Sequence, residues 1–183
     1  HLRGKGCLLV DTTCGSVLNV WKNVRRYARE GFTAVIHGKY YHEETRATAS
    51  QALTDPSGRY LCVRDRRETE IVCAFIRGAL DRETFTGTFE RAMSPDFDPE
   101  RDLARIGLAN QTTMLMSESL AIQQMLQAAL SDRFGEAELA TRFRAFDTIC
   151  SATQDRQDAV LRLLSESRLD LMIVIGGYNS SNT

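Results

Sequence analysis

The 183-residue sequence has almost no excess of charge, with 23 Lys and Arg against 24 Asp and Glu and a formal net charge of −1. This balance gives no electrostatic reason to expect nucleic acid or an anionic membrane as a partner. No apolar run approaches the roughly 18 residues that a membrane span needs, the longest being LDLMIVIGG. A Walker lysine motif and a GxGxxG fingerprint are both missing, which argues against the usual nucleotide-binding sites.

The five cysteines are an odd number and show no CxxC spacing. This pattern argues against both a secreted disulfide scaffold and a zinc finger. Cys7, Cys62 and Cys73 lie inside apolar runs, so we interpret them as small buried hydrophobic residues. Cys14 and Cys150 differ, because each follows a short apolar segment and is flanked by Thr, Ser and Asp, in LLVDTTCGS and FDTICSATQ.

Short apolar runs alternate with stretches of helical periodicity along the chain. This alternation predicts an α/β fold built from parallel βαβ units, with helices covering both faces of the sheet. The expected strands are CLLV, GFTAVIHG, YLCV, RIGLANQT, FDTIC and LDLMIVIGG. The expected helices cover residues 17–28, 44–53, 68–80, 117–130 and 156–167. We expect Leu18 and Leu120 on the apolar faces of the first and fourth helices, Ser117 at the start of the fourth, and a loop at SPDFDPE.

Five polar loops follow these expected strands, at residues 11–16, 37–45, 109–113, 147–154 and 176–183. In parallel sheets ligands collect at the carboxyl ends of the strands, so these loops are the candidate site. HGKYYHEET (37–45) holds two of the three histidines beside two carboxylates, which fits either a solvated loop or a site that handles protons or anions. GGYNSSNT (176–183) fits either an ordinary turn or a cradle for phosphate oxygens.

Five motifs in order, VDTTC, IHGKYYHEETRATAS, ANQTTM, DTICSATQDRQ and VIGGYNSSNT, resemble the LytB/IspH family of 4-hydroxy-3-methylbut-2-enyl diphosphate reductases. The resemblance runs from about residue 8 to the last residue. Within it, HGKYYHEET is similar to the sequences of the branch found in plants and cyanobacteria. It implies three α/β units in a trefoil-like arrangement around a central cleft. It also implies reductive dehydroxylation of the diphosphate substrate to isopentenyl and dimethylallyl diphosphate in the non-mevalonate isoprenoid pathway.

The resemblance implies a 4Fe–4S cluster held by three cysteines, of which Cys14 and Cys150 match the second and third. The first has no match here, and Cys7 does not lie in its motif. Gly15 stands where the family commonly has proline, which leaves the ligand in place but makes the turn less stiff.

The resemblance also assigns roles to polar residues of the other loops. In its H-x-E pattern His42 would bind the diphosphate in protonated form and Glu44 would relay a proton to the departing hydroxyl, with Glu43 as the rival carboxylate. Thr112 would assist proton delivery. The diphosphate would be held by the matching C-terminal set, Ser180, Ser181 and Asn182. His37 is interpreted as a structural residue or as one that supports the site residues without binding the substrate.

The chain starts at His1 without Met and stops at NSSNT, so we expect a segment of a longer protein. Residues 1–14 would end a preceding α/β unit, 15–146 would form the central unit, and 147–183 would begin a third, truncated unit. The resemblance implies ferredoxin or flavodoxin as electron donor, and a location in the bacterial cytoplasm or plastid stroma. Two alternatives stay open: an inactive fragment that acts only as a binding or scaffold domain, and a metal-dependent hydrolase using His37, His42 and Glu44.

Overall fold

The computed structural model describes residues 12–146 and 151–177 and is built around one parallel sheet. Its strands are β1 (Thr33–His37), β2 (Tyr60–Val63), β3 (Ile106–Asn110) and β4 (Phe143–Ala145), in the order β2-β1-β3-β4. Every residue of β1 and β3 is buried, as expected for the central strands of a sheet covered on both faces. The predicted parallel α/β class is therefore confirmed.

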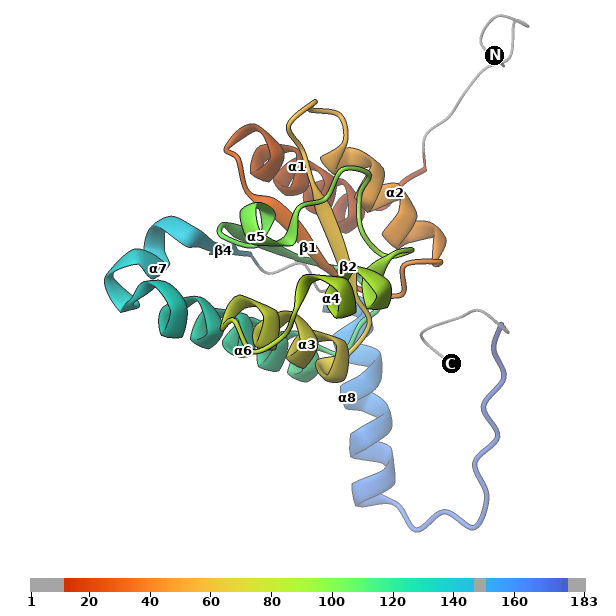
Figure 1. Ribbon diagram of the computed structural model, residues 1–183. Coiled ribbons are helices and arrows are strands. Elements are labelled where there is room, and N and C mark those ends of the chain that lie inside the picture. Colours follow the sequence, from red (N-terminus) through yellow and green to blue (C-terminus); the bar gives the residue numbers. More distant parts are fainter. Residues whose placement is uncertain (1–11, 147–150, 178–183) are drawn as a thin grey trace, which may run out of the picture.

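Helices cover both faces of this sheet (Figure 1). On one face lie α1 (Gly15–Arg29) and α2 (Glu43–Ala52), and on the other lie α3 (Arg66–Ile76) and α6 (Met116–Phe134). The shorter helices are α4 (Arg82–Phe89), α5 (Pro99–Asp102) and α7 (Glu136–Arg142). In Figure 1, α8 (Ser151–Glu166) projects away from the sheet.

Local chemistry explains where several of these helices begin. Asp65, Asp81 and Asp98 precede α3, α4 and α5, and each side chain accepts a hydrogen bond from a first-turn backbone N–H. Such caps satisfy donors that the helix itself leaves unpaired. Pro99 at the start of α5 costs nothing there, because its missing N–H would have had no partner within the helix.

Gly107 lets α1 approach the sheet closely. A Cβ at this position would lie 2.4 Å from ring carbons of Tyr27, which is buried and donates its hydroxyl proton to the Leu108 carbonyl at 3.2 Å. Burial raises the pKa of Tyr27, so this hydroxyl keeps its proton. The contact fixes α1 over β3.

Several predicted details are wrong. Residues 169–177, expected as a buried strand, form no strand, and the described sheet does not pair with them. The first helix buries Val20, Val24, Tyr27 and Ala28, while Leu18 is exposed, and Leu120 of α6 is exposed as well. Each apolar stripe is rotated from the expected one because only one side of each helix faces the core.

Element ends also differ from the expectation. The fourth predicted helix begins at Met116, and Ser117 does not cap it, since the cap position is Leu115 without a side-chain hydrogen bond. The predicted loop SPDFDPE contains the start of α5, and α4 was not predicted. The strand expected at FDTIC falls largely on residues outside the described ones, whereas β4 lies just before it at Phe143–Ala145.

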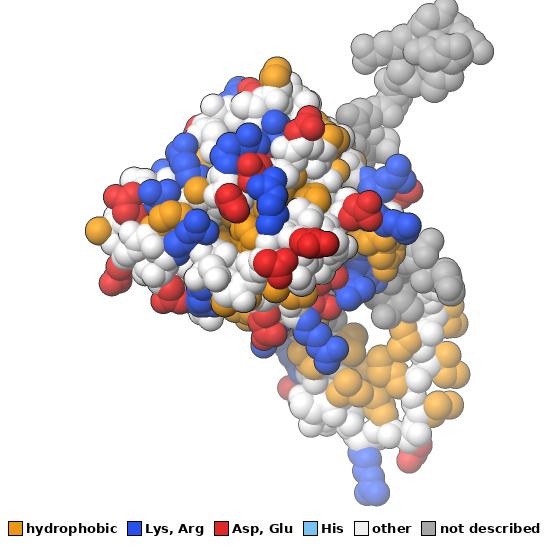
Figure 2. All heavy atoms as spheres, in the orientation of Figure 1, with side chains coloured by type: hydrophobic (Ala, Val, Ile, Leu, Met, Phe, Trp, Pro, Cys, Tyr) orange, Lys and Arg blue, Asp and Glu red, His pale blue; other side chains and the backbone are white. Residues whose placement is uncertain are grey.

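Apolar side chains on α8 and on residues 169–175 are exposed, and Figure 2 shows them gathered along this part of the molecule. Elsewhere on the face shown in Figure 2, basic and acidic side chains are interspersed. Within the described residues, we find no helix with both the length and the apolar character needed to cross a bilayer.

Candidate functional site

The direction of the chain through the sheet reverses between β1 and β3. The chain passes from β1 through α2 to β2 on one side, then returns across β1 to form β3 on the other. Ligands of open parallel sheets bind at such a switch point, beyond the carboxyl ends of the strands. His37 and Asn110, the last residues of β1 and β3, are paired in register there. Two of the five predicted loops, 37–45 and 109–113, therefore meet.

Gln111 joins these two loops through its backbone and its side-chain amide. Its N–H donates to the His37 carbonyl at 2.8 Å. Its Oε1 accepts from the Thr45 hydroxyl at 3.0 Å and from the Lys39 N–H at 3.3 Å, while Nε2 donates to the Thr113 hydroxyl at 2.7 Å. Gln111 is fully buried, so these bonds replace the water it loses and fix one loop against the other.

Gly38 makes this close approach possible. A Cβ there would lie 2.7 Å from the Thr45 hydroxyl oxygen and 2.9 Å from the Cβ of Gln111, closer than real Cβ atoms come. Sequence reasoning did not single out Gly38 or Gln111. The only signal available was a buried-strand pattern followed directly by a glycine and an amide.

Glu44 and Thr112, both predicted site residues, are in direct contact. The Thr112 N–H donates to the Glu44 Oε1 at 2.6 Å, and Thr112 is buried. The neighbouring Glu43 has a side chain that is 91% exposed and lies 3.8 Å from the Arg46 guanidinium. Of the two adjacent carboxylates, Glu44 is the one that the fold directs toward the switch point.

His42 caps α2, the helix that carries both glutamates. Its Nδ1 accepts a hydrogen bond from the Glu44 N–H at 3.2 Å. In this arrangement Nδ1 carries no proton, so the ring has its proton on Nε2. This leaves Nε2 as the ring nitrogen that can donate to an anion.

His37 is buried at the end of β1 and lies within hydrogen-bond distance of Ser119, with 2.8 Å between Nδ1 and Oγ. Its Nε2 is 3.9 Å from the Glu118 carboxylate and, among the described residues, has no hydrogen-bond partner. Burial lowers the pKa of His37 to about 4, so the ring is neutral at physiological pH. This geometry fits the structural role that we expected.

A cleft of about 270 Å³ opens beside the switch point between β3, β4 and α6. Asn110 lines it together with Met116, Ser119 and Ala145. The Asn110 Oδ1 is buried and finds no hydrogen-bond partner among the described residues. A buried acceptor of this kind is normally satisfied by a ligand group or by water. The sequence motifs did not indicate a role for Asn110.

The N-termini of four helices point toward this edge of the sheet. Helices α2, α3 and α6 each follow a strand, and α1 packs on β1, the strand that follows it. The positive ends of their dipoles therefore face the switch point, which favours anionic ligands there.

The cysteines separate into two groups. Cys62 and Cys73 are buried, and burial raises their pKa values to about 12 and about 11, which confirms them as packing residues. Cys14 is exposed and immediately precedes α1, at the helix end that faces the site. Cys7 and Cys150 lie outside the described residues.

Ser180, Ser181 and Asn182 also lie outside the described residues. Within residues 12–146 and 151–177, His, Cys, Asp and Glu side chains form no group of three that could hold a metal ion. The hydrolase alternative based on His37, His42 and Glu44 therefore has no support from the described geometry.

Comparisons with known proteins agree with these motifs. A family model described as LytB protein matches residues 1–183. The chain is 53% identical to a 4-hydroxy-3-methylbut-2-enyl diphosphate reductase of Synechococcus sp. (strain RCC307), covering all of this chain and 43% of the relative. It is 50% identical to the protein of that name from Cyanothece sp. (strain PCC 7425), covering 44% of that relative. The chain thus spans less than half the length of these curated relatives.

Two solved structures share the fold. The E-1-hydroxy-2-methyl-but-2-enyl-4-diphosphate reductase of Plasmodium falciparum matches 94% of this chain and 42% of its own, with a TM-score of 0.60 at 23% identity. A second, titled (E)-4-hydroxy-3-methyl-but-2-enyl diphosphate reductase, the terminal enzyme of the non-mevalonate pathway, matches with a TM-score of 0.51 at 26% identity. It covers 99% of this chain and 50% of that one.

Proposed function

The chain belongs to the LytB protein family, and we propose that it supplies part of the active site of a 4-hydroxy-3-methylbut-2-enyl diphosphate reductase. The observation that carries this proposal is the contact of Glu44 with Thr112 at the switch point of the sheet. Because the chain spans 43% of the first relative, the complete reaction is assigned to the whole protein.

The proposed reaction removes the allylic hydroxyl of the substrate as water. Two electrons and two protons enter, and isopentenyl or dimethylallyl diphosphate leaves. A 4Fe–4S cluster would supply the electrons, which a ferredoxin or flavodoxin would deliver. Cys14 and Cys150 would hold this cluster, together with a third cysteine outside this sequence. The exposed position of Cys14 at a helix N-terminus fits a thiolate ligand, in contrast to the buried Cys62.

The residues of this chain would hold the substrate and move a proton. Glu44 would pass a proton from its carboxyl group to the leaving hydroxyl, and the Thr112 N–H, which donates to its Oε1, would fix one of its oxygens. His42 would donate from Nε2 to a diphosphate oxygen, since its Nδ1 is already bonded to the Glu44 N–H. Ser180, Ser181 and Asn182 would complete the diphosphate site.

We further propose that residues 15–146 form one α/β unit of a trefoil-like protein. Helix α1 through strand β4, Gly15–Ala145, belong to one sheet and its covering helices, which supports this boundary. Residues 1–14 and 147–183 would belong to neighbouring units. The similarity to cyanobacterial proteins supports the bacterial cytoplasm, or the plastid stroma of a photosynthetic eukaryote, as the place of action.

The proton role is tested with Glu44→Gln in the whole protein, with Glu43→Gln as a charge-matched control. We expect Glu44→Gln to keep the absorbance of the cluster and lose about 100-fold or more of turnover, because the amide cannot supply a proton. Glu43→Gln should retain turnover, because its side chain points to solvent. Normal turnover in Glu44→Gln would remove this carboxylate from the proton path.

A second candidate is that the 183-residue chain by itself is a non-catalytic binding or scaffold unit. Only two of its cysteines match the three of the family. We therefore propose that the isolated chain neither holds a stable cluster nor turns over substrate. Anaerobic reconstitution with iron and sulfide tests this, with Cys14→Ser and Cys62→Ser compared in the whole protein. Only Cys14→Ser should lose the cluster, whereas turnover by the isolated chain would contradict the proposal.

A further inference from the structure

A second cleft lies at the opposite, amino edge of the sheet. Its volume is about 460 Å³, and four arginines line it, Arg59, Arg101, Arg105 and Arg142. We call it the arginine cleft. Among the described residues, Asp102 is the only acidic one that lines it, so these walls carry a net positive charge of three.

The topology of the sheet brings three of these arginines together. Arg59 immediately precedes β2, Arg105 precedes β3 and Arg142 precedes β4. Because the strands are parallel, their first residues lie along one edge. Three positive charges far apart in the sequence thus meet where the strands begin, although like charges repel one another without an anion between them.

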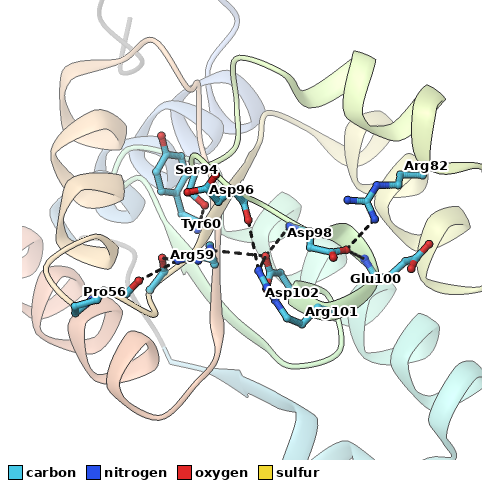
Figure 3. Close-up of polar contacts among 11 residues, drawn as sticks. Pro56, Arg59, Tyr60, Arg82, Ser94, Asp96, Asp98, Glu100, Arg101 and Asp102 are labelled. Atoms are coloured by element: carbon cyan, nitrogen blue, oxygen red, sulfur yellow. Dashed lines mark hydrogen bonds and ion pairs between the residues drawn. The ribbon is translucent and has the colours of Figure 1, made fainter.

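The Asp102 carboxylate already accepts hydrogen bonds from protein donors. Figure 3 shows Arg59 and Arg101 converging on its carboxylate. Arg101 donates through Nε to Oδ1 at 2.7 Å and through Nη2 to Oδ2 at 3.0 Å, and the Asp98 N–H donates to Oδ2 at 2.8 Å. The Arg59 Nε is 3.9 Å from Oδ2, within ion-pair reach but too far for a hydrogen bond.

Two further arginines are held in place by aromatic rings. The Arg105 guanidinium lies 4.1 Å from the centre of the Phe32 ring and donates to the Glu30 carbonyl at 3.0 Å. The Arg142 guanidinium lies 4.0 Å from the centre of the Phe134 ring. Contacts of this kind fix a guanidinium group while leaving other donors available.

Two of these guanidinium groups carry an unpaired nitrogen. The Nε atoms of Arg59 and Arg142 are buried, and the described residues offer neither a hydrogen-bond partner. The Arg142 Nη2 is 3.4 Å from the half-exposed Glu138 carboxylate, a pair that solvent weakens. Buried donors without acceptors are costly, so the described residues do not fully satisfy either arginine.

We propose that the arginine cleft binds a small molecule carrying a phosphate or diphosphate group. Guanidinium forks match the geometry and charge of phosphate oxygens, and a net charge of three favours a multiply charged anion over a single carboxylate. The volume lies in the range of small-molecule sites, about 300–1,000 Å³. The five residues of β1 separate the cleft from the switch point, a rise of roughly 17 Å, so this is a second anion site.

The test is titration of inorganic pyrophosphate into the chain, followed by calorimetry and by backbone amide NMR shifts. We expect shifts at residues 31–33, 57–59 and 101–105. The double variant Arg59→Gln/Arg142→Gln should bind at least about tenfold more weakly, whereas Arg162→Gln on α8 removes the same kind of charge elsewhere and should bind as the unmodified chain does. Circular dichroism verifies folding.

Should the double variant not fold, Arg59→Lys replaces it. This change keeps the charge but loses the guanidinium fork, so we expect pyrophosphate binding to weaken severalfold. Shifts confined to residues 37–45 and 110–113, or unchanged affinity in the folded arginine variant, would overturn the proposal. Tighter binding of citrate than of pyrophosphate would overturn the choice of phosphate. Because turnover is not measured, failure here leaves the reductase proposal intact.

Discussion

The buried His37 predicts that the chain loses stability in weak acid. Burial lowers its pKa to about 4 in the folded chain, against about 6.5 in an unfolded one. As the pH falls below 6.5, His37 becomes protonated in the unfolded state but stays neutral in the folded state. The stabilisation is therefore complete above pH 6.5 and is lost progressively toward pH 4. At pH 5 this linkage lowers the free energy of unfolding by about 2 kcal/mol relative to pH 7.

Urea unfolding at pH 7 and pH 5 measures this loss, with the fluorescence of Trp21, the only tryptophan, as the signal. His37→Asn removes the titrating ring but keeps a polar side chain for Ser119. The variant should be less stable at pH 7 yet lose about 2 kcal/mol less on acidification.

Asp55→Asn is the control for this experiment. The Ser57 hydroxyl and N–H hold the pKa of Asp55 below its usual value, so its titration falls below pH 4 and outside the window. Its acid sensitivity between pH 7 and pH 5 should match that of the unmodified chain. Equal losses in the unmodified chain and in His37→Asn would refute the reasoning, because another group would then be responsible.

Two further predictions concern packing and buried polar groups. Gly107→Ala should lower the free energy of unfolding by about 1–3 kcal/mol, because the new methyl group would overlap the Tyr27 ring; Gly87→Ala, with open space around its Cβ, should be neutral or slightly stabilising in the same denaturation assay. Gln111→Leu should cost about 2 kcal/mol, because the buried Thr45 hydroxyl loses its acceptor. Retained stability in Gly107→Ala or Gln111→Leu would contradict the corresponding contact.

Much of the sheet could be predicted because its central strands are continuous apolar runs bounded by polar turns. FTAVIH and IGLAN have this pattern, and both are buried throughout. The meeting of loops 37–45 and 109–113 also followed from the sequence, since parallel strands bring their carboxyl ends together. Glu44 and Thr112 lie in these two loops, which is why they come into contact.

The features that could not be predicted depend on contacts between residues that are far apart in the sequence. Gln111 is one polar residue among many in the sequence, and only its burial against Thr45 gives it a structural role. The arginines at positions 59, 105 and 142 form a set only once the strand order places their strands side by side. Exposure of Leu18 likewise depends on which side of α1 packs on the sheet.

The apolar segment LDLMIVIGG shows the limit of reasoning from local propensity. Its β-branched and apolar residues favour a strand, but a strand exists only where a neighbour pairs with its backbone. The described sheet has four strands, and the edge strand β4 does not pair with this segment. Ile173 and Ile175 are consequently exposed, at 74% and 92%. Composition therefore predicted what this segment prefers, but the described residues place no strand beside it.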